Sequence, residues 1–126
     1  MIGGRENVLY DKVYAFALRI IKAYRFLTGE QKEYILSKQL LRCGTSIGAN
    51  IAEANSAISN ADFSAKMSIA YKESLETKYW LNLLHDSDYI PSKNFESILA
   101  EADELSKMLF TTIRSSRSLN NRAAIS

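Results

Sequence analysis

Apolar residues recur every three or four positions along most of the chain, and this is the spacing of one face of an α-helix. The pattern predicts four helices, at about residues 8–27, 31–58, 60–86 and 92–114. Short connections make consecutive helices antiparallel neighbours. We therefore expect an all-α protein, an antiparallel up-down-up-down four-helix bundle that forms a single domain over residues 1–126.

Turn and capping residues mark the ends of the predicted helices. Gly29 is expected to end the first helix in the left-handed conformation that glycine adopts easily. Asn60 is a suitable N-cap for the third helix, and Pro91 separates the third helix from the fourth. After Arg114 the sequence SSRSLNNRAAIS shows no apolar periodicity, so residues 115–126 are expected to form a disordered basic tail.

The predicted helix 60–86 has more apolar surface than a bundle core requires. Its core stripe consists of Phe63, Met67, Ala70, Ser74, Thr77, Leu81 and Leu84. A second stripe beside the first contains Ile69, Trp80 and Leu83. An apolar face outside the core is typical of a surface that contacts another chain, so these three are candidate interface residues of a homo-oligomer. The alternative is a thick core into which the long aromatic side chains fold.

The predicted helix 31–58 carries a polar stripe beside its apolar one. The apolar stripe consists of Leu36, Leu40, Cys43, Ile47, Ile51, Ala54 and Ile58. The polar stripe includes Arg42, Ser46, Asn50 and Glu53. An antiparallel hairpin that turns near residue 60 would pair Arg42 with Glu76, Ser46 with Glu73 and Glu53 with Lys66. We expect a polar network between these helices, and an exposed ladder of weak surface salt bridges is the alternative.

Small residues in the same stretch, RCGTSIGANIAEA, need a separate explanation, because glycine is a poor helix former. Gly44, Gly48, Ala49 and Ala52 have small side chains or none. We expect them to let a neighbouring helix approach closely.

Composition narrows the class of protein. The chain is 47% hydrophobic and contains one proline, one cysteine and one histidine. A single cysteine excludes an intrachain disulfide, and no apolar run approaches the roughly 20 residues that span a bilayer. These features predict a soluble, cytoplasmic protein without a membrane partner. Cys43 is expected to be a buried small hydrophobe, and His85 is expected to have a role at a helix end or in solvent.

Two pairs of glutamates are the only candidate catalytic group. Glu73 with Glu76, and Glu101 with Glu104, are each spaced one helical turn apart. Such pairs on two helices can hold magnesium, which would define a metal-dependent nucleotide hydrolase. However, Glu76 is expected to face Arg42, and Glu104 lies far from the apolar stripe of its helix. We therefore expect no enzyme, metal or cofactor, and keep the hydrolase as the alternative.

Basic residues gather at one end of the expected bundle. Up-down-up-down order places the start of the first helix, the turn near residue 60 and the end of the fourth helix together. The candidate nucleic-acid-binding residues at this end are Arg5, Lys12, Lys66, Arg114, Arg117 and Arg122. Arg19, Lys22 and Arg25 lie further along the first helix and are instead expected to pair with the acidic start of the fourth. Binding would be tolerant of sequence, because no base-reading module is present.

Two stretches, LLRCGTSIGANIAEA and IAYKESLETKYWLNLLHDSDYI, resemble the four-helix-bundle proteins first noticed as open reading frames inside intervening sequences of bacterial 23S rRNA genes. The matching positions are Arg42, Ser46-Ile47, Asn50 to Glu53, Glu73 to Thr77, Tyr79 to Leu81 and Tyr89-Ile90. The resemblance covers about residues 8–114. Asp88 stands where glycine is common in this family, and Ala54-Asn55 stands where a glycine and an aromatic residue often follow.

The resemblance implies a homopentameric ring of bundles without a settled biochemical role. It also implies a relation to the accessory variability protein of diversity-generating retroelements, a basic barrel that engages a reverse transcriptase and nucleic acid. Together with the residue pattern, it leads us to expect a non-enzymatic, homo-oligomeric scaffold. Its expected partners are RNA or DNA and a reverse transcriptase or another protein.

Overall fold

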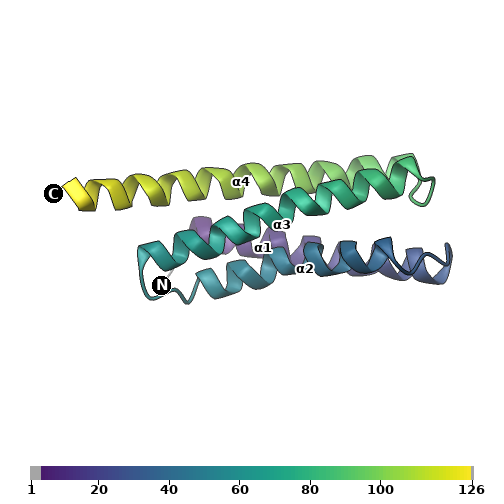
Figure 1. The fold of residues 1–126 in the computed structure, drawn as a ribbon, viewed down its shortest axis with the longest axis horizontal. Helices are drawn as coiled ribbons and strands as arrows, with labels where there is room; N and C mark the ends of the chain where they lie inside the picture. Colours follow the sequence, from purple (N-terminus) through teal and green to yellow (C-terminus); the bar gives the residue numbers. More distant parts are fainter. Residues whose placement is uncertain (1–3, 126) are drawn as a thin grey trace.

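The computed structural model describes residues 4–125, and it describes the side chains of residues 8–117. Four helices make up this part of the chain: α1 (Gly4–Gly29), α2 (Leu36–Ala54), α3 (Asn60–Asp86) and α4 (Ser92–Ile125). No β-strand occurs between residues 4 and 125. Consecutive helices run in opposite directions along one axis, and α4 extends beyond the other three at its C-terminal end (Figure 1). The predicted all-α four-helix bundle is confirmed.

The core lies between the helices and takes one apolar stripe from each. The largest fully buried side chains are Phe16, Ile20, Leu27, Leu40, Ile47, Ile51, Met67, Leu81, Leu84, Leu105, Leu109 and Val13. Polar groups within these stripes are paired. The hydroxyl groups of Ser74 and Ser106 lie 2.8 Å apart between α3 and α4, and Thr77 donates to the Glu73 carbonyl at 2.7 Å. Contacts are most extensive between α2 and α3 and sparsest between α1 and α4.

Gly44 and Gly48 lie on the side of α2 that packs against α1. A Cβ atom at Gly44 would meet Cγ1 and Cγ2 of Ile20 at 2.9 Å, closer than real Cβ contacts. A Cβ atom at Gly48 would lie 3.6 Å from Val13, an ordinary van der Waals distance. The absence of a side chain at Gly44 is therefore what allows the branched side chain of Ile20 to pack there.

The connection between α1 and α2 differs from the prediction. Gly29 remains helical, and no described glycine has a positive φ; Lys32, with φ 56°, adopts the left-handed conformation instead. The chain reverses at Lys32 because the Glu33 N–H donates to the Leu27 carbonyl at 2.9 Å. The helix predicted from residue 31 starts at Leu36, because the Glu33 carboxylate accepts hydrogen bonds from the first N–H groups of α2.

The turn between α2 and α3 corrects two further predictions. α2 ends at Ala54, so Ile58 lies in the turn, 95% exposed, and does not join the core. The N–H of Ala57 donates to the Ala54 carbonyl at 3.0 Å, which tightens the chain into a turn. Ser59, and not Asn60, caps α3: its backbone is extended and its hydroxyl accepts from the Asp62 N–H at 3.0 Å.

The tail expected to be disordered continues α4 as a helix to Ile125. Asn60 and Ser116 explain the first turn of this extension. The Asn60 amide donates to the Ser116 carbonyl at 3.2 Å, and the Ser116 hydroxyl donates back to the Asn60 side chain at 3.1 Å. Because Asn60 makes this contact between α3 and α4, α4 still packs against the bundle at Ser116, beyond the predicted helix end at Arg114.

Candidate functional site

The predicted polar network forms between α2 and α3. The Arg42 guanidinium donates to the Glu76 carboxylate and lies 3.4 Å from Glu73, while Lys66 pairs with Glu53 at 3.0 Å. Trp80 extends the cluster, because its indole N–H donates to the Glu76 carboxylate at 2.9 Å. The expected contacts of Arg42 with Glu76 and of Glu53 with Lys66 are thus confirmed.

The remaining part of the network differs from the prediction. Glu73 pairs with Arg42 and not with Ser46, since the guanidinium spans both glutamates one turn apart. Ser46 instead accepts from the Asn50 amide at 3.2 Å within α2. The Arg42 side chain is 50% exposed, so solvent screens the cluster in an isolated chain. Pairs of this exposure contribute about 1 kcal/mol or less to folding.

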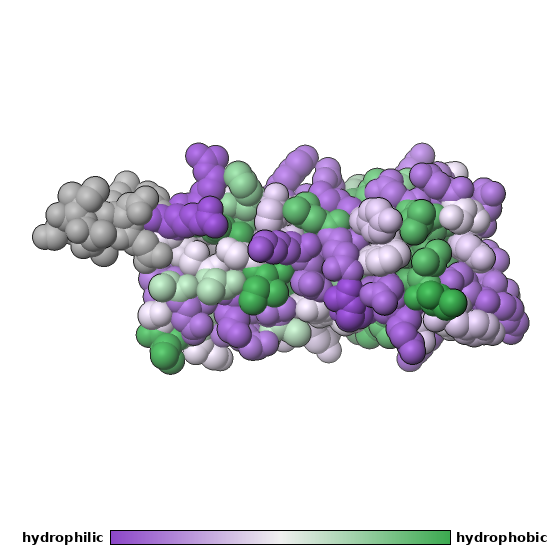
Figure 2. Space-filling model, viewed as in Figure 1, coloured by the Kyte–Doolittle hydropathy of each residue, from purple (hydrophilic) through white to green (hydrophobic). Residues whose placement is uncertain are grey.

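Exposed apolar side chains lie outside the bundle core on two faces. On α3, Ile69, Leu75 and Tyr79 are exposed, and Tyr79 makes an edge contact with Trp80 at a centroid distance of 5.0 Å. Leu83 is partly buried beside them. Figure 2 shows hydrophobic residues of this face lying among hydrophilic ones. We call Ile69, Leu75, Tyr79, Trp80 and Leu83 the α3 strip.

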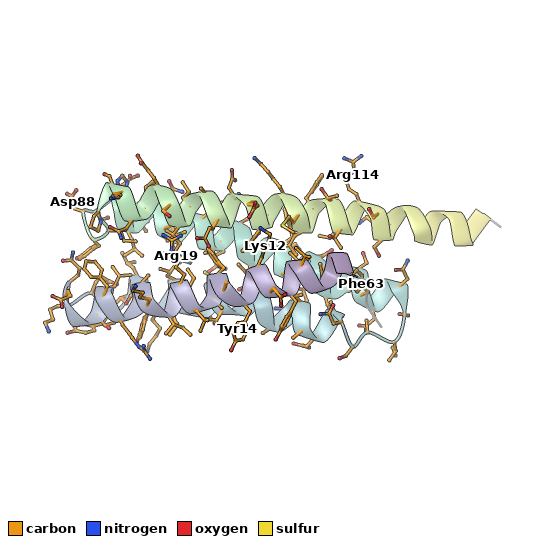
Figure 3. All side chains as sticks on the ribbon, turned by 180° about the vertical axis from the view of Figure 1, so that it is seen from behind. Lys12, Tyr14, Arg19, Phe63, Asp88 and Arg114 are labelled. Carbon is orange, nitrogen blue, oxygen red and sulfur yellow. The ribbon has the colours of Figure 1, made fainter. Side chains whose placement is uncertain are left out.

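A second apolar strip on α1 was missed by the sequence analysis. Tyr14 is 56% exposed and Leu18 is 55% exposed, one turn apart on the same face. In Figure 3 Tyr14 points away from α4 and out of the bundle. We call this pair the α1 strip. In the sequence these residues fit an ordinary amphipathic helix. Their exposure depends on which sides of α1 are covered by α2 and α4.

The candidate basic residues are not equivalent. Lys12 pairs with Glu104 at 3.2 Å and Lys66 pairs with Glu53, so both are largely neutralised. Arg114 lies over the Phe110 ring, 5.8 Å from its centroid, and points away from the bundle (Figure 3). Arg117 is exposed. Neither arginine makes an ion pair within the part of the chain whose side chains are described. The side chains of Arg5 and Arg122 lie outside that part.

The two glutamate pairs do not converge on one site. Glu73 and Glu76 face Arg42 on the α2 side of α3. Glu101 accepts from Arg19, as the charge pattern predicted for that helix, and Glu104 pairs with Lys12, so both face α1. Among the residues whose side chains are described, no three potential metal ligands are close enough to share an ion. The four glutamates therefore do not form the single metal centre that the alternative, a carboxylate-metal hydrolase, would need.

The nucleophilic and basic side chains also lack a catalytic setting. Burial raises the pKa of the Cys43 thiol to about 11, although Thr77 donates to its sulfur at 3.3 Å. The thiol is therefore neutral and unreactive at neutral pH. His85 contacts Asp86 and Ser92 at 3.2 and 3.1 Å, in the order of a serine-hydrolase triad. However, Asp86 is 74% exposed and the groove nearby is not lined by Ser92, so these contacts join the end of α3 to the start of α4.

No helix in the described residues has the length and apolar character needed to cross a bilayer. The fold and its surface thus define a helical bundle with exposed apolar strips on α1 and α3 and without a convergent reaction centre among the described side chains. The profile of 23S rRNA-intervening sequence proteins matches residues 5–111, and the chain belongs to this family. The resemblance inferred from the two stretches is confirmed.

The chain matches a solved structure but no curated protein. The chain is similar to a protein of unknown function from the S23 ribosomal protein family of Bacteroides thetaiotaomicron, determined by crystallography. The two are 51% identical, with a TM-score of 0.86, over 87% of this chain and 98% of that one. The comparisons therefore identify family and fold, and they assign no activity.

Proposed function

We propose that this protein is a non-enzymatic scaffold that assembles with copies of itself and holds RNA or DNA at the end where α4 projects. The observation that carries the proposal is the position of Arg114 and Arg117. Ser116, which lies between them in the sequence, contacts Asn60 at the start of α3, so both lie near the end of the bundle beyond which α4 extends (Figure 1). Neither arginine forms an ion pair with a described carboxylate. Cations that have no ion-pair partner are the groups that release counterions when they contact phosphates.

Assembly strengthens this interaction. One chain presents few free arginines, and so few contacts would give weak binding at physiological salt. An oligomer repeats the same end in every copy, and linked contacts raise the overall affinity without any new contact. The α1 and α3 strips supply surfaces through which copies would associate. Nothing described at the projecting end is placed to read base edges, so binding is expected to tolerate sequence.

The nucleic-acid part is tested by fluorescence anisotropy with labelled single- and double-stranded RNA and DNA. The double variant Arg114→Gln/Arg117→Gln should bind more weakly than the natural chain at about 50 mM salt, and its log affinity should depend less steeply on log salt. The matched control is Arg25→Gln/Lys38→Gln, which removes two exposed charges elsewhere. Deleting residues 115–126 should weaken binding in the same way while the oligomer persists. Equal losses in test and control variants would show only a general effect of charge.

The rival function is tested separately. Purified protein incubated with magnesium or manganese and nucleoside triphosphates is expected to give no turnover. Turnover that disappears in Glu73→Gln would overturn the non-enzymatic assignment. If no RNA or DNA binds at about 50 mM salt, the nucleic-acid part of the proposal is wrong and the scaffold binds only proteins.

A further inference from the structure

The seam between α1 and α4 has fewer contacts than the other seams between neighbouring helices, and polar bridges cross it. Lys12 pairs with Glu104 across this seam. Two turns further along α1, the Arg19 guanidinium contacts Glu101 and Ser97. Figure 3 shows Lys12 and Arg19 directed across this seam toward α4. Beyond Arg19, toward the α3–α4 connection, the seam opens into a groove of about 320 Å³. This volume lies at the lower end of the range for small-molecule sites.

The groove has an apolar floor and a cationic rim. Phe26, Ile90, Pro91 and Ile98 supply apolar surface to the groove, and the fully buried Leu27 and Leu81 lie beneath it. The polar lining residues are Arg19, Lys22 and Asn94, and no aspartate or glutamate lines the groove. This composition suits a molecule that combines an apolar part with a negative charge.

Lys22 is the group that would receive that charge. Arg19 already donates to Glu101 and to the Ser97 hydroxyl, with an Nη2–Oγ distance of 2.8 Å. Lys22 is exposed, and it makes no ion pair with any described side chain. The Asn94 amide adds N–H donors on the opposite wall, from α4. A carboxylate at this rim would gain a charge-assisted hydrogen bond without displacing an existing ion pair.

The extent of the groove favours a small ligand over a docked helix. Its α1 wall runs from Arg19 to Leu27, a rise of roughly 12 Å at 1.5 Å per residue. Ile90 and Pro91, from the α3–α4 connection, also line it, and the Arg19 bridges cross the seam. A helix following the seam would meet both obstacles, whereas a short hydrocarbon chain fits between them.

We propose that the groove between α1 and α4 binds a small amphiphilic carboxylate, with its hydrocarbon tail against Phe26 and Ile98 and its head group at Lys22. The groove lies beside the α3–α4 connection, whereas Arg114 lies toward the other end of the bundle (Figure 3). It is therefore independent of the proposed nucleic-acid function, and either can fail without the other.

The test is calorimetric titration of the full chain with hexanoate, octanoate and decanoate below their micelle-forming concentrations, and with 1-octanol as the uncharged control. Saturable binding of one ligand per chain is expected, with affinity rising up to about fourfold for each added methylene that the floor buries. Octanol should bind more weakly than octanoate. Absence of saturable binding, or equal affinity for octanol and octanoate, would overturn the proposal.

Variants locate the ligand. Lys22→Gln should lower octanoate affinity about two- to fivefold, as expected for one partly exposed ion pair. Lys22→Glu should abolish measurable binding, because it places like charges together. Lys38→Gln removes an exposed lysine from α2 and should leave affinity unchanged. Ala23→Phe, which fills the groove, should also prevent binding. All three lysine variants change surface residues, so unaltered affinity in Lys22→Gln and Lys22→Glu would reject the site even if Ala23→Phe fails to fold.

Discussion

Individual residues set the distances between helices, and Gly44 is the strongest example. Ile20 is fully buried, and its branched atoms occupy the space that a side chain at position 44 would need. Because Cγ1 and Cγ2 are fixed close to the backbone, the clash cannot be relieved by a small rotation of a flexible end. The close packing that Gly44 permits therefore outweighs the conformational cost of a glycine inside a helix.

Gly44→Ala and Gly48→Ala make a matched pair within one helix. Alanine gains about 1 kcal/mol over glycine in a helix interior, while overpacking a core costs about 1–3 kcal/mol. Gly48→Ala should raise the free energy of unfolding by about 0.5–1 kcal/mol, because Val13 leaves it room. Gly44→Ala should lower it by about 1 kcal/mol. Chemical denaturation of both variants measures the difference, and stabilisation by Gly44→Ala would show that Ile20 moves aside at little cost.

Glu33 is a residue whose charge starts a helix. Its carboxylate accepts from the N–H groups of Ile35, Leu36 and Ser37 at 3.1, 3.0 and 2.6 Å. Burial by itself would raise the pKa of Glu33, but these backbone hydrogen bonds outweigh it and hold the pKa below its ordinary value of 4.5. A carboxylate at a helix N-terminus is also favoured by the helix dipole.

The contribution of Glu33 should therefore depend on pH in a defined direction. Its folded-state pKa is depressed, so its stabilisation is fully present above pH 4.5 and is lost as the pH falls through the folded-state value. Glu33→Gln should cost about 1 kcal/mol at pH 7, the usual contribution of a helix cap. The gap between the two proteins should narrow in acid. Denaturation curves at pH 7 and below pH 4 test this, and a gap that widens in acid would contradict it.

At the scale of the element, periodicity predicted the number, order and facing of the helices but not their ends. Spacing alone places Arg42 opposite Glu76, because the register of an antiparallel hairpin is set by where it turns. Helix ends depend on contacts that are remote or conformational. The start of α2 differs from the prediction because of the Glu33 carboxylate and the left-handed Lys32. The end of α4 differs because Asn60 contacts Ser116. For the same reason the α1 strip was missed, since exposure of Tyr14 depends on where the other helices lie.

The end of α3 carries a conformational cost that one substitution should remove. Asp88 has φ 66°, and the N–H groups of Asp88 and Tyr89 donate to the carbonyls of His85 and Leu84, the pattern of a Schellman motif. Left-handed backbone costs a residue with a side chain about 1 kcal/mol, and glycine avoids this cost. Asp88→Gly should therefore raise the melting temperature, and Asp88→Ala should lower it. A lower melting temperature for Asp88→Gly would mean that the aspartate side chain stabilises the turn.

At the scale of the whole molecule, the two apolar strips bear on symmetry. α3 lies at the front of the view in Figure 1, whereas α1 lies at the front of the opposite view in Figure 3. A dimer with a two-fold axis uses the same patch on both chains, while different patches that meet head to tail generate rings or filaments. Strips on separate faces therefore favour a ring, which agrees with the pentamer that the resemblance implies.

Mixing two defective variants distinguishes a ring from a dimer. If the α1 strip of one chain meets the α3 strip of the next, Leu18→Glu and Ile69→Glu should each give single chains by light scattering. Each variant keeps one intact strip, so an equal mixture should form pairs and stop there, because the remaining strips are both defective.

Trp80→Ala should weaken assembly in the same way as Ile69→Glu, while Ile58→Glu, at the exposed turn, should leave it unchanged. A natural chain that scatters as a single chain at low micromolar concentration would refute assembly. Normal assembly of Leu18→Glu would instead exclude the α1 strip and leave an interface made by α3 alone.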